Sequence, residues 1–226
     1  MEKLEPLFSI NIFGYSFGVT DSFLVMWIIT LIIVVAAIIL GKNLEKIPSK
    51  KQNKVEMVIE LINGLVNDNM GPGHKAFIPY IGTLAIFLLI MNLIGLIGIE
   101  PPTRDYNIAL GLALMSFVLV QANAIKKIGF GHYLKGYLHP FAFLLPLNLI
   151  ERFVLPVSLS LRLFGNMTAA VVVVGLVYDG LSKIGWFAQL GIPLPVHMFF
   201  DVFDAGMQMF IFVMLTMINI KVIEEH

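Results

Sequence analysis

The chain has 226 residues, of which 58% are hydrophobic and 13% are charged, with a mean hydropathy of +0.88. Soluble domains are about 45–50% apolar and about 25% charged, so this chain has too little polar surface for a water-soluble globule and belongs in a membrane. Its 15 basic and 15 acidic residues give zero net charge, which excludes a nucleic-acid binder that relies on a basic surplus, and the lack of cysteine excludes disulfides and thiolate metal sites.

The first two thirds of the chain hold three apolar runs long enough to cross about 30 Å of hydrocarbon. Residues 22–41 form the first run, and we interpret it as a retained span because the residues before it lack the positive region of a cleaved signal. Residues 51–70 differ, with Val, Ile and Leu at helical spacing between Glu and Asn. This pattern predicts an amphipathic helix in the membrane interface. Residues 76–99 and 107–126 are the next two predicted spans.

The last third contains two unusually long apolar stretches, residues 141–178 and 187–221. As helices they would be roughly 50–57 Å long at about 1.5 Å per residue, which far exceeds the hydrocarbon core. They must therefore break or tilt strongly, and the short connection at 179–185 predicts a tilted helical hairpin. The sequence thus predicts an all-α membrane protein with a single membrane domain over residues 1–226. It has about five membrane-embedded helices plus one interfacial amphipathic helix.

Lysine placement predicts the orientation of these spans. Ten of the twelve lysines fall on one side of a five-span arrangement, and only Lys3 and Lys183 fall on the other. Because lysine and arginine concentrate in cytoplasmic loops, we expect the N-terminus outside the cell and the C-terminus in the cytoplasm.

Arg162 is the most informative charge, because it lies near the middle of the 141–178 stretch. An arginine at the bilayer centre costs about 2.5–3.5 kcal/mol on insertion scales. A structural ion pair or a snorkelling side chain is the alternative to a functional role. Snorkelling is disfavoured because Arg162 is about 16 residues from Tyr178 at the end of the stretch.

Polar side chains form one stripe on each long helix, at spacings that a helix of about 100° per residue brings to one face. A polar stripe on an apolar helix is typical of a water-accessible path. Two carboxylates three residues apart on one face repel each other, which makes one of them a candidate to exchange protons. The first stripe is Glu151, Ser158, Arg162 and Asn166, and the second is His197, Asp201, Asp204 and Gln208.

The predicted hairpin places the two stripes against each other, with Arg162 near Gln208 and Asn166 near Asp201 and Asp204. Simpler interpretations of several of these residues remain open. His197 is interfacial or a relay, the aspartates form an ion path or a cluster at a helix start, Gln208 pairs Arg162 or makes an ordinary bond between helices, and Glu151 serves the path or pairs with Arg152.

Several segments resemble subunit a of the F-type ATP synthases. The most specific is SLRLFGNMTAA at residues 160–170, followed by QMFIFVMLT at residues 208–216. Residues 92–96 (NLIGL), 102–105 (PTRD) and 139–151 (HPFAFLLPLNLIE) are similar to further segments of that family. The resemblance extends over roughly the last three quarters of the chain.

The resemblance implies an ion-translocating stator with two offset half-channels beside a rotating c-ring. Arg162 matches the family's essential arginine, which faces the ring carboxylates, and Asn166 and Gln208 match polar residues close to it. Asp105 matches an acidic residue at the mouth of the outer half-channel, and Glu151 matches one on the cytoplasmic path.

One departure concerns the outer path. Val171 stands where some relatives carry Glu or His, so the outer path depends on Asp201 and Asp204. The ion is H⁺ or Na⁺, and the sequence does not distinguish them.

The resemblance also implies the surroundings of the chain. The partners are the c-ring subunits, the b subunits of the peripheral stalk, the whole ATP synthase complex and membrane lipid, in the inner (plasma) membrane of a bacterial cell. Nucleotide catalysis belongs to partner subunits, so the chain is no enzyme on its own and needs no cofactor or metal. The alternative is an ion-coupled secondary transporter with a charged site at the midplane.

Overall fold

The computed structural model describes residues 8–12, 15–42, 44–131, 133, 141, 143, 145–183, 185, 187–191 and 193–225. Some sequence predictions therefore concern residues outside this part of the chain. These are the N-terminal end at residues 1–7, most of the segment before Leu145 that carries part of the resemblance, and Ile192 within the last predicted span.

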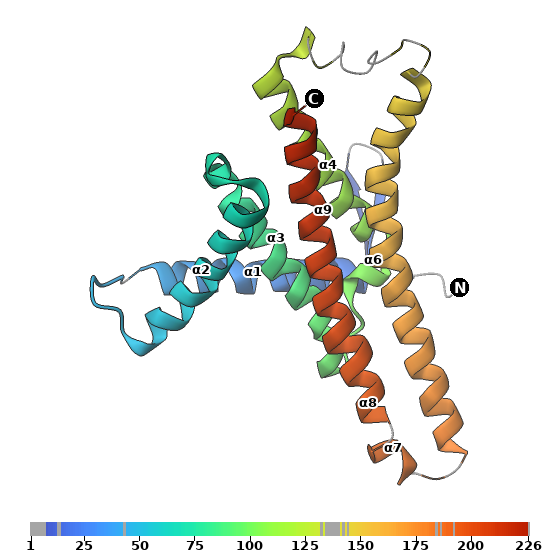
Figure 1. Cartoon of the computed structure of the whole chain (residues 1–226). Coiled ribbons are helices and arrows are strands. Elements are labelled where there is room, and N and C mark those ends of the chain that lie inside the picture. The colour runs from blue at the N-terminus through green and yellow to red at the C-terminus, as the bar shows by residue number, and fades with distance from the viewer. Residues whose placement is uncertain are drawn as a thin grey trace.

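The described elements are mainly helical, with a strand pair at the start (Figure 1). In chain order they are β1 (Phe8–Ile12), β2 (Tyr15–Val19), α1 (Asp21–Gly41), α2 (Lys50–Met70), η1 (Pro72–Phe77), α3 (Ile78–Leu93), η2 (Ile94–Ile97), η3 (Pro102–Arg104), α4 (Tyr106–Ile128), α6 (Leu145–Ser182), α7 (Ala188–Gly191), α8 (Pro193–His197), η5 (Met198–Asp204) and α9 (Ala205–Glu225).

Five helical stretches in the described residues are long and apolar enough to cross a membrane. They are α1, the run Pro72–Ile97, α4, α6 and the run Pro193–Ile223. With the amphipathic α2 they confirm the predicted all-helical membrane fold. The β1–β2 hairpin was not predicted; it pairs antiparallel with Phe8 opposite Val19 and Ile12 opposite Tyr15.

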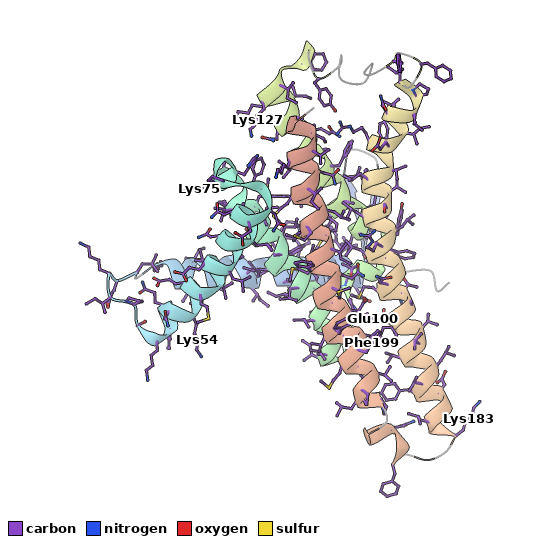
Figure 2. The ribbon with its side chains drawn as sticks, viewed as in Figure 1. Lys54, Lys75, Glu100, Lys127, Lys183 and Phe199 are labelled. Atoms are coloured by element: carbon purple, nitrogen blue, oxygen red, sulfur yellow. The ribbon has the colours of Figure 1, made fainter. Side chains whose placement is uncertain are left out.

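The surface of α1 is typical of a lipid-facing helix. Only Ser22 and Ile29 of this helix are buried, whereas Leu31 and Ile39 are more than 60% exposed. Apolar side chains also cover the outer faces of the long helices, as the sticks radiating from the bundle show (Figure 2). Such a continuous apolar exterior is compatible with hydrocarbon around the protein and not with water.

The amphipathic helix α2 packs one face on the bundle and leaves the other open. Ser49 caps its first turn by accepting a hydrogen bond from the Gln52 amide. Ile62, Val66 and Met70 are buried against α3 and α9, while Met57 and Leu61 are exposed. The apolar and polar spacing of residues 51–70 therefore predicted this helix well.

The core lies where α3, α4 and α9 meet, and α6 packs against α4 (Figure 1). Leu88 and Met91 of α3 are buried here against Val213 and Met217 of α9. Alanine at buried positions of α4, such as Ala109, permits the close helix approach that is common in membrane bundles. The core thus fixes α9 firmly and leaves α6 with a broad outer face.

The two long helices run antiparallel beside each other, and α1 passes behind α9 at a steep inclination to both of them in Figure 1. The 38 residues of α6 correspond to about 57 Å of helix. The predicted helix 187–221 corresponds, in the described residues, to the short α7 and a continuous helical run Pro193–Ile223, in which η5 is a π-helical segment between α8 and α9. A π-helical turn contains an extra residue, and apolar spacing alone does not reveal it.

Candidate functional site

Arg162 occupies the middle of α6, 17 residues after Leu145 and 20 before Ser182. Its side chain is half-buried, and among the described residues it has no hydrogen bond and no ion pair. A guanidinium carries five N–H donors and a permanent charge. This charge is therefore not neutralised by any described acid of its own chain.

Gln208 lies on the neighbouring helix α9 and is 3% exposed. Its Nε2 donates to Oδ1 of the half-buried Asp204 at 3.4 Å. Its Oε1 is buried and has no partner in the described part of the chain. An unpaired buried acceptor is costly, so this oxygen is available to a donor that arrives from outside.

His197 and Asp201 form a pair one turn apart, at the start of the π-helical segment. The His197 Nδ1 lies 2.5 Å from the Asp201 Oδ2. On the other side of the ring, Nε2 lies 3.1 Å from the hydroxyl of Tyr178, which belongs to α6. The three side chains thus connect the two long helices near the end where they are joined.

A cavity of about 230 Å³ opens next to this pair. Its polar lining residues are Glu100, His197 and Asp201, and its apolar wall includes Val171 and Val174 of α6. Glu100, labelled in Figure 2, thus lies at the same cavity as residues of α6 and of the α8–η5 run. Charged groups in a concave space between spanning helices make this cavity a candidate functional site.

The residues of α6 that lie opposite Asp201 differ from the sequence prediction. We expected Asn166 opposite Asp201 and Asp204, but Met167, Ala170 and Val171 line the cavity with Asp201. Neither Asn166 nor Asp204 is among the described lining residues. Asp201 instead pairs with His197 and Asp204 with Gln208, each with the residue four positions away on its own helix.

Glu100 was not predicted as a site residue, because in the sequence it marks only the end of an apolar span. It is ion-paired with Arg104 one turn later, in the loop between α3 and α4. This loop is packed into the bundle, with Pro101, Pro102 and Thr103 all buried. A charged pair directly after an apolar span was the available signal.

Asp105, the last residue of this loop, starts α4. Its Oδ1 accepts a hydrogen bond from the Asn107 amide at 2.9 Å, which is an N-cap interaction. The side chain is 6% exposed and is not among the described residues that line the cavity.

The remaining predicted residues lie on the outer face of α6. Glu151 and Ser158 are exposed, and Asn166 is half-buried. No group of three or more His, Cys, Asp or Glu in the described chain could hold a metal ion.

Spanning helices with an uncompensated central arginine and a charged cavity define a multi-pass membrane protein of the ion-translocating class. The family model of the ATP synthase A chain matches residues 23–221. A sodium ion specific ATP synthase subunit a of Propionigenium modestum is 34% identical over 223 residues, covering 92% of this chain and 75% of that protein. The subunit a of Geobacter sp. (strain M21) is 36% identical and that of Listeria monocytogenes 33%, and the whole chain matches 94% and 100% of them.

The chain therefore belongs to the family of ATP synthase A chains, the subunits a. This confirms the resemblance of residues 160–170 and 208–216. A member of this family is the ion-translocating subunit of the membrane stator, for H⁺ or Na⁺, and is not the catalytic part of the ATP synthase complex.

Proposed function

We propose that the chain provides two offset half-channels that meet at Arg162, where a carboxylate of the c-ring passes. The unpaired state of Arg162 carries this proposal. A permanent charge in the middle of a helix of about 57 Å needs an acidic partner, and no described residue of the chain supplies one. A moving acid on another subunit would supply it transiently.

The charge of Arg162 then couples rotation to ion flow. An ionised carboxylate cannot enter lipid cheaply, so each ring carboxylate must bind its ion before it leaves the stator. Arg162 stabilises the carboxylate only while it is empty, and it repels a cation that would pass directly between the half-channels. One elementary charge that crosses 100 mV releases about 2.3 kcal/mol, which is the energy available per ion.

The outer half-channel contains the cavity with His197, Asp201 and Glu100, and it continues through Asp204 to Gln208. The 230 Å³ volume and the three polar lining residues support this assignment. The free Oε1 of Gln208 supports a place for it next to Arg162.

The inner half-channel follows the other end of α6, past Asn166, Ser158 and Glu151. All three are at least partly exposed and belong to one helix face. Since the face is open over this length, the c-ring would close it. The resemblance gives Asp105 a place near the outer mouth, but its side chain is buried and is not among the described lining residues of the cavity, so we assign it mainly to capping α4.

The orientation follows the lysines. Lys75 and Lys127 lie toward one end of the molecule and Lys183 toward the other (Figure 2). By the positive-inside rule, the end with Lys75 and Lys127 faces the cytoplasm, the N-terminus lies outside and the C-terminus inside the inner (plasma) membrane of a bacterium. Because α1 is steeply inclined to α6 and α9 in Figure 1, an α1 that stands upright in the membrane leaves the long pair strongly tilted. The b subunits of the peripheral stalk would hold this stator in place.

The decisive experiment is ATP-driven ion pumping by membrane vesicles that contain the complex with Arg162→Ala. We expect pumping to be abolished while the complex still assembles. Arg162→Lys should restore little, since a point charge lacks the planar guanidinium fork. Normal pumping by Arg162→Ala would refute the proposal. Ion transport by the purified chain alone, without the ring, would favour a secondary transporter instead.

A further inference from the structure

The Asp201 carboxylate has a bonding partner at one oxygen and close backbone packing at the other. Oδ2 bonds His197 Nδ1 at 2.5 Å, and the Tyr178 hydroxyl holds the other ring nitrogen at 3.1 Å. If Nδ1 donates to the carboxylate, then Nε2 of a neutral ring accepts from the tyrosine. Tyr178 therefore acts on Asp201 through the imidazole, across the junction between α6 and η5.

The second oxygen lies against a glycine. A Cβ placed on Gly95 would be 3.2 Å from Oδ1 of Asp201 and 3.5 Å from its Cγ. A contact of 3.2 Å is tighter than ordinary van der Waals packing, so a side chain at this position would push the carboxylate away. The short segment η2 thus provides a flat backbone wall for Oδ1.

Taken together, these contacts come from three separate elements, η2, α6 and the α8–η5 run. From them we propose that Gly95 and Tyr178 are positioning residues that fix the Asp201 carboxylate at the cavity, so that it receives the external ion in one orientation. This inference rests on the proposed outer half-channel. Neither residue needs to touch the ion: glycine has no side chain, and the tyrosine acts through His197. The proposal is the same for H⁺ and for Na⁺.

Fixed orientation is expected to matter for ion capture and less for the maximal rate. A carboxylate that has lost one neighbour samples more conformations, so a higher external ion concentration is needed to occupy it. The loss of one hydrogen bond, or a shift of similar cost, corresponds to roughly a 2- to 10-fold change.

The test uses vesicles with the whole ATP synthase, energised by a fixed membrane potential. ATP synthesis is measured against the H⁺ or Na⁺ concentration on the cavity side. Gly95→Ala and Tyr178→Phe should each raise the half-saturating ion concentration roughly 2- to 10-fold, with a nearly unchanged maximal rate. A merely structural defect would instead lower the amount of active complex and hence the maximal rate.

Two variants serve as matched controls. Gly111→Ala adds the same methyl group on α4, where nothing lies within 4 Å of the new Cβ. Tyr106→Phe removes a hydroxyl that has no hydrogen bond among the described residues, and it keeps the ring contact with Phe164. Both should behave like the unmodified complex.

A second measurement repeats both changes in an Asp201→Ala background. Without the carboxylate there is nothing to position, so Gly95→Ala and Tyr178→Phe should have no further effect on the half-saturating concentration. If Gly95→Ala prevents assembly of the complex, Tyr178→Phe alone tests the proposal, because the loss of a single oxygen atom is too small a change to prevent assembly.

The inference is overturned if both variants match their controls, or if they shift the half-saturating concentration equally without Asp201. In that case only the inference about Gly95 and Tyr178 fails, because the proposed function stands as long as pumping still depends on Arg162. Pumping that is independent of Arg162 would remove the proposed function first.

Discussion

Thr103 and Asn92 are joined by a buried hydrogen bond, in which the Thr103 hydroxyl donates to the Asn92 Oδ1 at 2.9 Å. Both residues are almost completely buried, with exposed fractions of 0% and 1%. The bond ties the loop between α3 and α4 to the end of α3, and it thereby holds Glu100 at the cavity.

Replacing this hydroxyl should weaken the loop. Thr103→Val keeps the shape but leaves Asn92 Oδ1 without a donor, in addition to its Nδ2, which already has no partner in the described residues. We expect a loss of about 1–3 kcal/mol, measured as a lower thermal unfolding midpoint of the purified complex. Thr83→Val is the control, because Thr83 is exposed and bonds only its own helix. An equal effect of both changes would contradict the prediction.

Two substitutions of Asp105 separate the contribution of its N-cap hydrogen bond from the contribution of its charge. Asp105→Ala should cost about 0.5–2 kcal/mol because the first turn of α4 loses its cap. Asp105→Asn should retain stability, since asparagine accepts the same hydrogen bond from Asn107. Because the side chain is buried and does not line the cavity, we also expect Asp105→Asn to keep most ATP-driven pumping. A strong loss of pumping at normal stability would give its charge the larger role at the outer mouth.

The close contact between α2 and α3 depends on Gly82. A Cβ there would meet two carbon atoms of the Ile62 side chain at 3.2 and 3.3 Å. Gly82→Ala should therefore destabilise the packing by about 1–3 kcal/mol. The double variant Gly82→Ala with Ile62→Ala should lose less stability than the sum of the two single changes, because both obstructing carbons are absent. A thermal unfolding series on the complex measures the coupling, and simple additivity of the two changes would refute it.

The two aspartates of the last long helix should contribute unequally. Asp201 lines the cavity, whereas Asp204 bonds Gln208 deeper along the helix. Asp201→Asn should slow ATP synthesis most at low external ion concentration, since the cavity loses its negative charge. Asp204→Asn should reduce the rate at all ion concentrations, because it acts after capture. Replacing both should slow access most, and unchanged rates at low ion concentration would count against this assignment.

Much of the fold was predictable because membrane spans are recognisable by their length and apolarity. The two long apolar stretches predicted the antiparallel pair, and the spacing of Ile62 and Val66 predicted the amphipathic helix. The β1–β2 hairpin was not predicted, although Phe8, Ile10 and Ile12 alternate with polar residues in the way that strands do. Strands of five residues are short beside spans of about 20 apolar residues, so their alternation is a weak signal.

The candidate site was predictable where chemistry is unusual for its place. Arg162 in an apolar helix stands out from the sequence alone, and His197 and Asp201 have the spacing of neighbours on one helix. The contact between Tyr178 and His197 depends on how two helices meet, so no spacing along the chain reveals it. Glu100 was overlooked for a similar reason, because its loop reaches the cavity only after the bundle is packed.

The π-helical segment has a consequence for how this helix could vary. The π-helical segment Met198–Asp204 holds one residue more than an α-helical turn. The direction of Asp201 around the helix axis can therefore change while Val213 and Met217 of α9 keep their packing. Removing one residue there would restore a regular α-helix and change which side chains of this segment face the cavity. The mouth of the path would then point elsewhere, while the central crossing with Gln208 kept its register.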